Sequence, residues 1–218
     1  MKLRPSVEAA AVLFHLIMVT SCASTPPSSF YTLTPLPTAA DRAGALTDRG
    51  RSVAIGPIDF PDFLDRPQIV SRAGANLLDV DELHRWAGSL QADFLRVLGE
   101  NLAHLLGTSL VFAVPPGVQF STDFRVIADV VRFEGTDDRT AVLKVRWAIL
   151  DAFSEQPLMV RESSYRQRIE GVGQEALVAA LSDVIGAFSR ELAGTLQRRP
   201  TPKPSTVRTA AHCEECTG

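Results

Sequence analysis

Three cysteines, Cys22, Cys213 and Cys216, carry the most distinctive chemistry in the chain. Cys213 and Cys216 have the Cys-x-x-Cys spacing that brings two thiolates to one soft metal ion, and His212 offers a third ligand. A structural zinc site takes four ligands, and the sequence has no second half-site elsewhere. A free or internally oxidised thiol pair is therefore the simpler interpretation, and we predict no metal and no cofactor.

Cys22 is different because it directly follows a leader sequence. Lys2 and Arg4 give the leader a positive start, and an apolar run extends from residue 9 to residue 20. Twelve helical residues at about 1.5 Å each span about 18 Å, well short of the roughly 30 Å hydrocarbon core of a bilayer. The run therefore predicts a signal peptide rather than a membrane span.

The end of this leader, Val19-Thr20-Ser21-Cys22, resembles the lipobox of bacterial lipoproteins. The resemblance implies that residues 1–21 are removed and that Cys22 becomes an N-terminus acylated with fatty acids such as palmitate. Three acyl chains would anchor the chain firmly, whereas a single chain binds reversibly. The alternative is an ordinary secretory leader that is cut elsewhere. Residues 22–29 are predicted to be the lipidated cysteine and a flexible tether.

A second candidate site is the segment from residue 59 to residue 68, where acids, aromatic residues and prolines alternate without helical or strand periodicity. Pro61 and Pro67 stiffen the segment and so limit the entropy lost on binding. We predict a partner-binding loop whose contact residues are Asp62, Phe63, Asp65 and Arg66. The alternative is a purely structural loop, with Phe60 and Phe63 in the core and Arg66 paired with Asp62 or Asp65.

The sequence lacks the patterns of the common hydrolases. It has no Gly-x-Ser-x-Gly elbow, no His-Glu-x-x-His motif and no glycine-rich phosphate loop, and its histidines beyond the leader are scattered. We therefore predict that the protein is not an enzyme. Without residues 1–21 the chain has 22 − 2 = 20 basic and 25 − 1 = 24 acidic residues, a net charge of −4 that argues against nucleic acid as a partner.

Two long amphipathic helices are predicted, over residues 81–106 and 174–196. In the first, apolar residues recur every three or four positions from Leu83 to Leu105, and Gly88-Ser89 marks a break. In the second, a stripe from Leu177 to Leu192 includes Phe188. Both stripes are expected to lie on the core of a sheet.

Strands are predicted at residues 30–34, 52–57, 68–72, 76–80, 110–114, 122–134, 140–153 and 158–170. The last three are expected to form an antiparallel meander whose polar third strand lies at an edge. The sequence thus predicts one α/β domain over residues 30–196, with a mixed, mainly antiparallel sheet of five or more strands packed by two long helices. Residues 197–218 have no apolar periodicity and are predicted to be a disordered tail.

Several of these segments together resemble the ABC-type transport auxiliary lipoproteins of the PqiC kind. The resemblance covers about residues 20–196 and is most specific in Pro-Asp-Phe-Leu-Asp-Arg-Pro-Gln at residues 61–68 and Arg-Trp-Ala at residues 85–87. It also includes Phe30-Tyr31-Thr32-Leu33, Ile55-Gly56-Pro57-Ile58 and the stretch from Arg96 to Leu102. Gly88-Ser89 and the Cys-x-x-Cys tail depart from the family pattern.

The resemblance implies a non-catalytic lipoprotein that faces the periplasm and supports envelope integrity. Its implied partners are an inner-membrane ABC transporter or related permease and a mammalian-cell-entry (MCE) type protein that forms a lipid conduit. Because Ala23 follows Cys22, as in lipoproteins passed to the outer membrane, we expect anchoring at the periplasmic face of the outer membrane. A lipoprotein activator of a peptidoglycan synthase is the alternative function. The oligomeric state stays open, with a homo-oligomer as one option.

Overall fold

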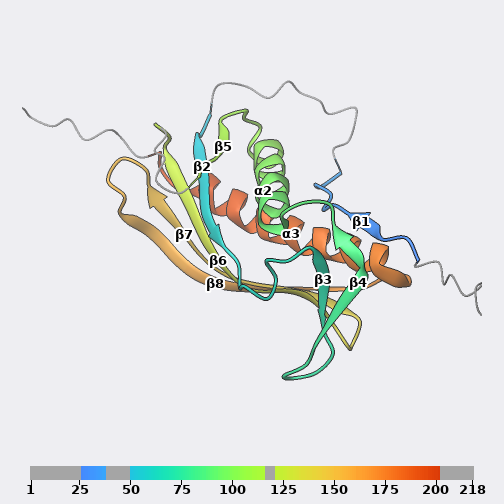
Figure 1. Ribbon diagram of the computed structural model, residues 1–218. Helices are drawn as coiled ribbons and strands as arrows, with labels where there is room; N and C mark the ends of the chain where they lie inside the picture. The colour runs from blue at the N-terminus through green and yellow to red at the C-terminus, as the bar shows by residue number, and fades with distance from the viewer. Residues whose placement is uncertain (1–25, 38–49, 116–120, 202–218) are drawn as a thin grey trace, which may run out of the picture.

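The computed structural model describes residues 26–37, 50–115 and 121–201, which form one α/β domain of two layers (Figure 1). Both described helices lie on the same face of a mixed sheet, which confirms the predicted class and the two long helices. In chain order the elements are β1 (Ser29–Tyr31), β2 (Val53–Asp59), β3 (Gln68–Arg72), β4 (Leu78–Trp86), α2 (Leu90–Leu106), β5 (Val111–Ala113), β6 (Phe124–Thr136), β7 (Thr140–Asp151), β8 (Pro157–Arg168) and α3 (Gly173–Arg198).

The sheet is built around β6, the longest strand that the structure describes. One edge of β6 pairs antiparallel with β7 along nearly its whole length. The other edge pairs first with β2 and then, at Gly135 and Thr136, with β3. The sheet therefore forks: β5 extends the β2 branch, while β4 and β1 extend the β3 branch. The chain from residue 60 to residue 67 crosses from one branch to the other.

The predicted meander of β6, β7 and β8 is confirmed by its register. The prediction of a mainly antiparallel sheet is wrong for the path β1-β4-β3-β6-β2-β5, in which four of the five described pairings are parallel. Antiparallel pairing can be predicted from the sequence when a short turn joins the two strands, as it does in the meander. Parallel neighbours are separated by long connections, so their pairing depends on how the intervening elements pack.

The predicted start of the first helix is also wrong. Residues 81–86 belong to β4, which pairs antiparallel with β3 and parallel with β1. The helix begins only after the predicted break, at Leu90, where the Ser89 hydroxyl caps it by accepting from the Ala92 amide at 3.3 Å. It ends at Gly107, whose φ of 67° is the left-handed conformation that favours glycine. Backbone pairing on both edges of β4 outweighed the helical spacing of Leu83 and Trp86.

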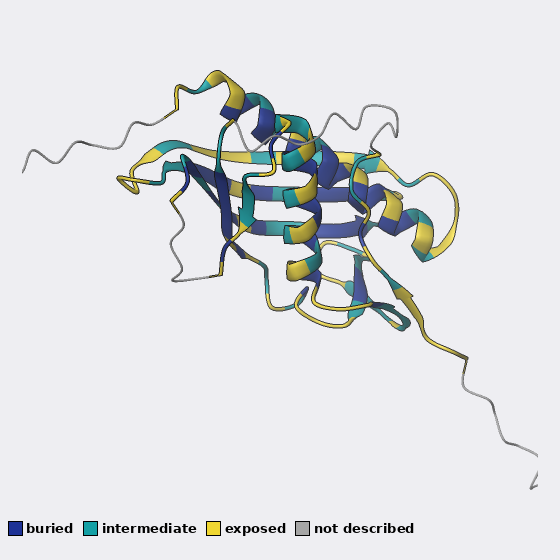
Figure 2. Cartoon of the chain, turned by 90° about the horizontal axis from the view of Figure 1, so that it is seen from above, coloured by how far each residue is buried: buried dark blue, intermediate teal, exposed yellow. Residues whose placement is uncertain are grey.

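The second predicted apolar stripe and the part of the first that lies on α2 face the core, whereas Leu83 of the first stripe is a partly buried residue of β4. Phe94 on α2 and Phe188 on α3 have no exposed surface. The Phe94 ring meets the ring of Phe133 on β6 edge-on at 5.4 Å between centroids, and Phe188 meets Trp147 on β7 at 5.9 Å. Figure 2 shows the buried sides of the two helices against the buried centre of the sheet. The other buried stripe residues are Leu90, Val97, Leu98 and Leu102 on α2, and Leu177, Leu181, Val184, Ile185 and Leu192 on α3.

The polar strand β8 lies at an edge, as predicted, because among the described residues it pairs only with β7. Several of its polar side chains fasten α3 to the sheet. Glu191 of α3 accepts hydrogen bonds from Arg161 Nη1 at 2.6 Å, from Ser163 Oγ at 3.3 Å and from the Tyr165 hydroxyl. Burial raises the pKa of the Glu191 carboxyl, but the hydrogen bonds and the charge of Arg161 outweigh burial and lower the pKa below its ordinary value.

Candidate functional site

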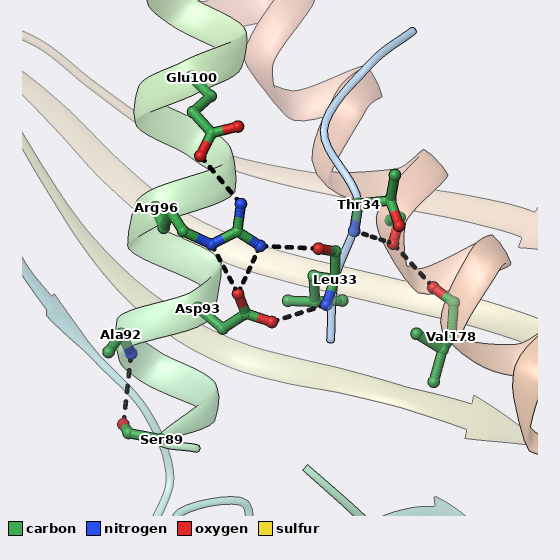
Figure 3. A network of polar contacts seen from close by, with 9 residues as sticks. Leu33, Thr34, Ser89, Ala92, Asp93, Arg96, Glu100 and Val178 are labelled. Atoms are coloured by element: carbon green, nitrogen blue, oxygen red, sulfur yellow. Dashed lines mark hydrogen bonds and ion pairs between the residues drawn. The ribbon is translucent and has the colours of Figure 1, made fainter. Parts of the chain in front are cut away.

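The chain that follows β1 lies across the two helices and forms a strap, which we define as residues 32–36 (Figure 3). Leu33 is 2% exposed and belongs to the core. Its amide donates to Asp93 Oδ2 at 2.6 Å, and its carbonyl oxygen accepts from Arg96 Nη2 at 2.8 Å. Arg96 in turn pairs with Asp93 at 2.6 Å, so one residue of the strap is bound through both backbone groups.

Side chains of both helices bind the rest of the strap backbone. The Thr34 amide donates to Ser182 Oγ on α3 at 3.0 Å, and the Leu36 amide donates to Asn101 Oδ1 on α2 at 2.7 Å. Asn101 Nδ2 donates to Ser189 Oγ on α3 at 3.1 Å, which links the two helices beneath the strap. The strap therefore connects the segment that leads back to Cys22 directly with the helical layer.

Sequence reasoning missed this polar set, although it left a signal. Asn101 lies between the apolar stripe residues Leu98 and Leu102, and Ser182 follows directly on Leu181. A polar residue inside an apolar stripe must find a hydrogen-bond partner when it is buried, and Asn101 is 1% exposed. Polar residues within the apolar stripes of α2 and α3 therefore indicate that another part of the chain hydrogen-bonds to these helices.

The predicted partner-binding loop, residues 59–68, lies at the fork of the sheet, and its first and last residues belong to β2 and β3. Leu64 is buried, and the Phe60 ring packs edge-on against Phe94 and Phe133 at 5.3 and 6.3 Å between centroids. Phe63 is half-buried and also contacts the core. The Leu64 amide closes a turn by donating to the Pro61 carbonyl at 2.9 Å. Apolar anchors and a backbone turn thus hold the loop in one shape.

The charged side chains of this loop behave differently from its aromatic ones. Asp62, Asp65 and Arg66 are all exposed. Among the described residues, no ion pair or hydrogen bond joins the Arg66 side chain to either aspartate. The structural alternative is therefore correct for Phe60 and in part for Phe63, and no described contact supports it for the charges. On a fixed backbone the loop presents three charges that have no side-chain partner in the described part of the chain.

A hollow of about 290 Å³ lies beside the start of the loop, where the carboxyl ends of β2 and β5 meet the beginning of α2. Its lining is mainly apolar and includes Ile58, Leu95 and Val114. Gly56 permits this close approach of β2 and β5: its φ is +125°, and a Cβ there would lie 2.5 Å from the Val114 carbonyl oxygen. Crevices at the carboxyl ends of parallel strands are common ligand sites.

The histidines that the structure describes do not meet. His84 Nδ1 lies 2.8 Å from Asp81 Oδ2 on β4, and Gln174 of α3 donates to the same oxygen at 2.9 Å. His104 is near the end of α2. Desolvation raises the pKa of Asp81, but its hydrogen bonds outweigh this effect and hold the pKa below the ordinary value. No group of three potential metal ligands occurs within the described ranges.

The predicted lipidation site and the thiol pair cannot be placed. Cys22 and the residues His212, Cys213 and Cys216 lie outside the described residues. Neither α2 nor α3 combines the length and the hydropathy that a membrane-crossing helix needs. The structure therefore describes the domain and its strap, whereas the prediction of a lipid anchor at Cys22 is based on the sequence alone.

A family model described as "ABC-type transport auxiliary lipoprotein component" matches residues 31–193 of the chain. No curated protein matches the sequence. Among solved structures, the fold is similar to that of an uncharacterized protein, with a TM-score of 0.64 and 18% identity over 78% of this chain and 99% of that chain. It is also similar to protein XCC0632 from Xanthomonas campestris, with a TM-score of 0.60 and 17% identity over 76% and 93%.

Proposed function

The chain belongs to the ABC-type transport auxiliary lipoprotein component family, and on this premise we propose that it is a non-catalytic component of an ABC/MCE-type intermembrane lipid transport system. In this proposal it is anchored at the periplasmic face of the outer membrane and docks on the MCE conduit protein. One observation supports docking above all: a loop fixed by buried apolar residues presents the unpaired charges of Asp62, Asp65 and Arg66. A preformed loop loses little entropy when it binds.

A lipid anchor at Cys22 would limit the distance between the domain and the membrane. Residues 23–28 separate Cys22 from β1, and six residues span at most about 20 Å when fully extended. The strap then holds the following residues on α2 and α3. A domain with lipidated Cys22 would therefore stay close to the membrane, so that the transport partner has to reach toward it.

Replacing Cys22 by serine is expected to remove the lipid, because serine lacks the thiol that is acylated. The variant should accumulate as an unprocessed or soluble precursor, and mass spectrometry should find no acyl groups. Cys213→Ser provides a matched control that should fractionate like the native protein. If the Cys22→Ser protein still gains lipid mass and sediments with the outer membrane, Cys22 is not the anchor.

Changing Asp62 and Arg66 together to alanine is expected to weaken binding of the MCE conduit protein at least about tenfold, because charged contacts on a rigid loop often dominate an interface. Both side chains are exposed, so the melting temperature should stay nearly unchanged. Binding is measured by pull-down and titration, and melting is measured on the same preparations.

The matched control for the loop is Arg168→Ala with Glu170→Ala, an arginine and an acid outside the loop whose side chains are 83% and 80% exposed, respectively. This pair should leave binding unchanged. Parallel losses of stability and binding in the loop variant would show that the loop is structural and that the partner contacts another surface.

A further inference from the structure

The sheet face opposite the helices is not covered by any described element (Figure 1). A row of apolar side chains crosses four strands on this face. Pro57 of β2 begins the row, Ile127 of β6 follows, and the register pairs Ile127 with Ala148 of β7 and Ala148 with Val160 of β8. Val160 is 73% exposed, although it belongs to a strand.

The row contains a hollow of about 270 Å³. Ala148 forms its floor, since the alanine is 7% exposed and has a shorter side chain than its neighbours Ile127 and Val160. An exposed valine beside an empty apolar hollow is unfavourable in water, because burying apolar surface is worth about 25 cal/mol per Å². The hollow has the shape of a socket for one large apolar side chain.

Charged residues along one side of the row leave a net negative rim. Arg146 is bound by Asp129 at 3.5 Å and by Glu162 at 3.0 Å, and Lys144 also pairs with Glu162, at 2.9 Å. The side chain of Asp59 is exposed and has no ion pair or hydrogen bond among the described residues. On the opposite side of the row Arg125 is paired with Glu155 at 3.7 Å. The unbalanced charge beside the row is therefore that of the Asp59 carboxylate.

We propose that the apolar row is a docking surface for a cationic amphipathic helix of a partner protein, which places one large apolar side chain in the socket over Ala148 and basic side chains beside Asp59. An apolar stripe flanked by basic residues matches both the row and its rim. This surface shares only Asp59 with the loop, since its lining includes none of Asp62, Phe63, Asp65 and Arg66.

Two other occupants fit less well. An anionic lipid surface would find no free cation in this rim, because Arg146 and Lys144 are paired with Asp129 and Glu162 and the unbalanced charge is that of Asp59. The described helices of a second copy could not supply such a helix, because α2 and α3 both bury their apolar stripes in their own domain. Charge complementarity therefore favours a basic helix from another protein.

The test uses two synthetic helical peptides of 18 residues with the same leucine stripe, one flanked by lysines and the other by glutamates. Binding to the full chain is measured by fluorescence anisotropy at low and physiological salt. The lysine peptide is expected to bind at least about tenfold more tightly than the glutamate peptide, and its affinity should fall with added salt. Equal binding of the two peptides would overturn the proposal.

Variants of the row locate the binding. Val160→Ser should weaken binding of the lysine peptide at least about fivefold. Ala148→Leu should weaken this binding to a similar extent, because the larger side chain fills the socket. Val172→Ser is the matched control, since Val172 is 87% exposed outside the row, and it should bind normally. The loop variant with alanine at 62 and 66 should also bind the peptide normally, which separates this proposal from the loop. Unchanged peptide binding by Val160→Ser would contradict the proposal that a basic helix docks on the row. Self-association or attachment to phosphatidylglycerol vesicles that depends on Val160 would also contradict it.

Discussion

Replacing Phe94 by alanine is expected to lower the free energy of unfolding by about 3–5 kcal/mol, the usual cost of removing a buried phenylalanine. Phe94 has no exposed surface, and its ring contacts those of Phe60 and Phe133. The cavity would lie where α2, the loop and β6 meet, so that neighbouring side chains cannot close it without moving the loop. A domain of this size has a stability of roughly 5–15 kcal/mol, and the loss is a large part of it.

The measurement is thermal and chemical unfolding of the Phe94→Ala protein. A loss of 3–5 kcal/mol corresponds to a fall in melting temperature of about 6–20 °C for a domain of this size. Phe30→Ala is the matched control, because Phe30 is 65% exposed and its truncation should change stability by less than about 0.5 kcal/mol. A shift of only a degree or two in the Phe94 variant would contradict the packing described above.

Replacing Leu33 by alanine is expected to loosen the strap and to lower the free energy of unfolding by about 2–5 kcal/mol. Leu33 is 2% exposed and belongs to the core, so its side chain helps to hold the strap on the helices. Its loss also weakens the hydrogen bonds that Asp93 and Arg96 make with its backbone. Leu77→Ala, the same change at a side chain that is 62% exposed, should have almost no effect.

Hydrogen exchange tests whether the Leu33 side chain holds the strap on α2 and α3. In the native protein the amides of Leu33, Thr34 and Leu36 should exchange slowly, because each donates to a side chain of α2 or α3. In the Leu33→Ala protein these amides should exchange faster than amides in β6 and β7. Slow strap exchange in the variant, together with unchanged stability, would mean that the strap is held by other contacts.

The features described here occupy different parts of the domain. The strap lies on the helical layer and connects it with the segment that leads to Cys22. The loop lies at the fork of the sheet, and the apolar row lies on the face opposite the helices. A protein tethered through the strap can therefore present the loop and the row to partners without either surface competing with the tether.

Local patterns in the sequence predicted those elements whose partners are close in the chain. The stripes around Phe94 and Phe188 and the meander of β6, β7 and β8 agree with the structure. Each depends on periodicity or on a short turn, which a sequence displays directly. In the loop the structure shows that Asp62, Asp65 and Arg66 are exposed, and partner binding by this loop stays a prediction.

Tertiary structure decided everything that depends on contacts between distant residues. The segment around His84 became a strand because β1 and β3 offer it backbone partners on both edges, an energy that helical spacing does not include. The parallel joins of β2 and β3 to β6 follow from the way the chain returns across the sheet. The strap needs Asp93, Asn101 and Ser182, which are brought to it from 60 or more positions away. Such pairings gain their energy only when the helices and the sheet are packed. The sequence by itself therefore determined most elements and their local pairing, whereas the fold determined the segment around His84 and the partners that are distant in the chain.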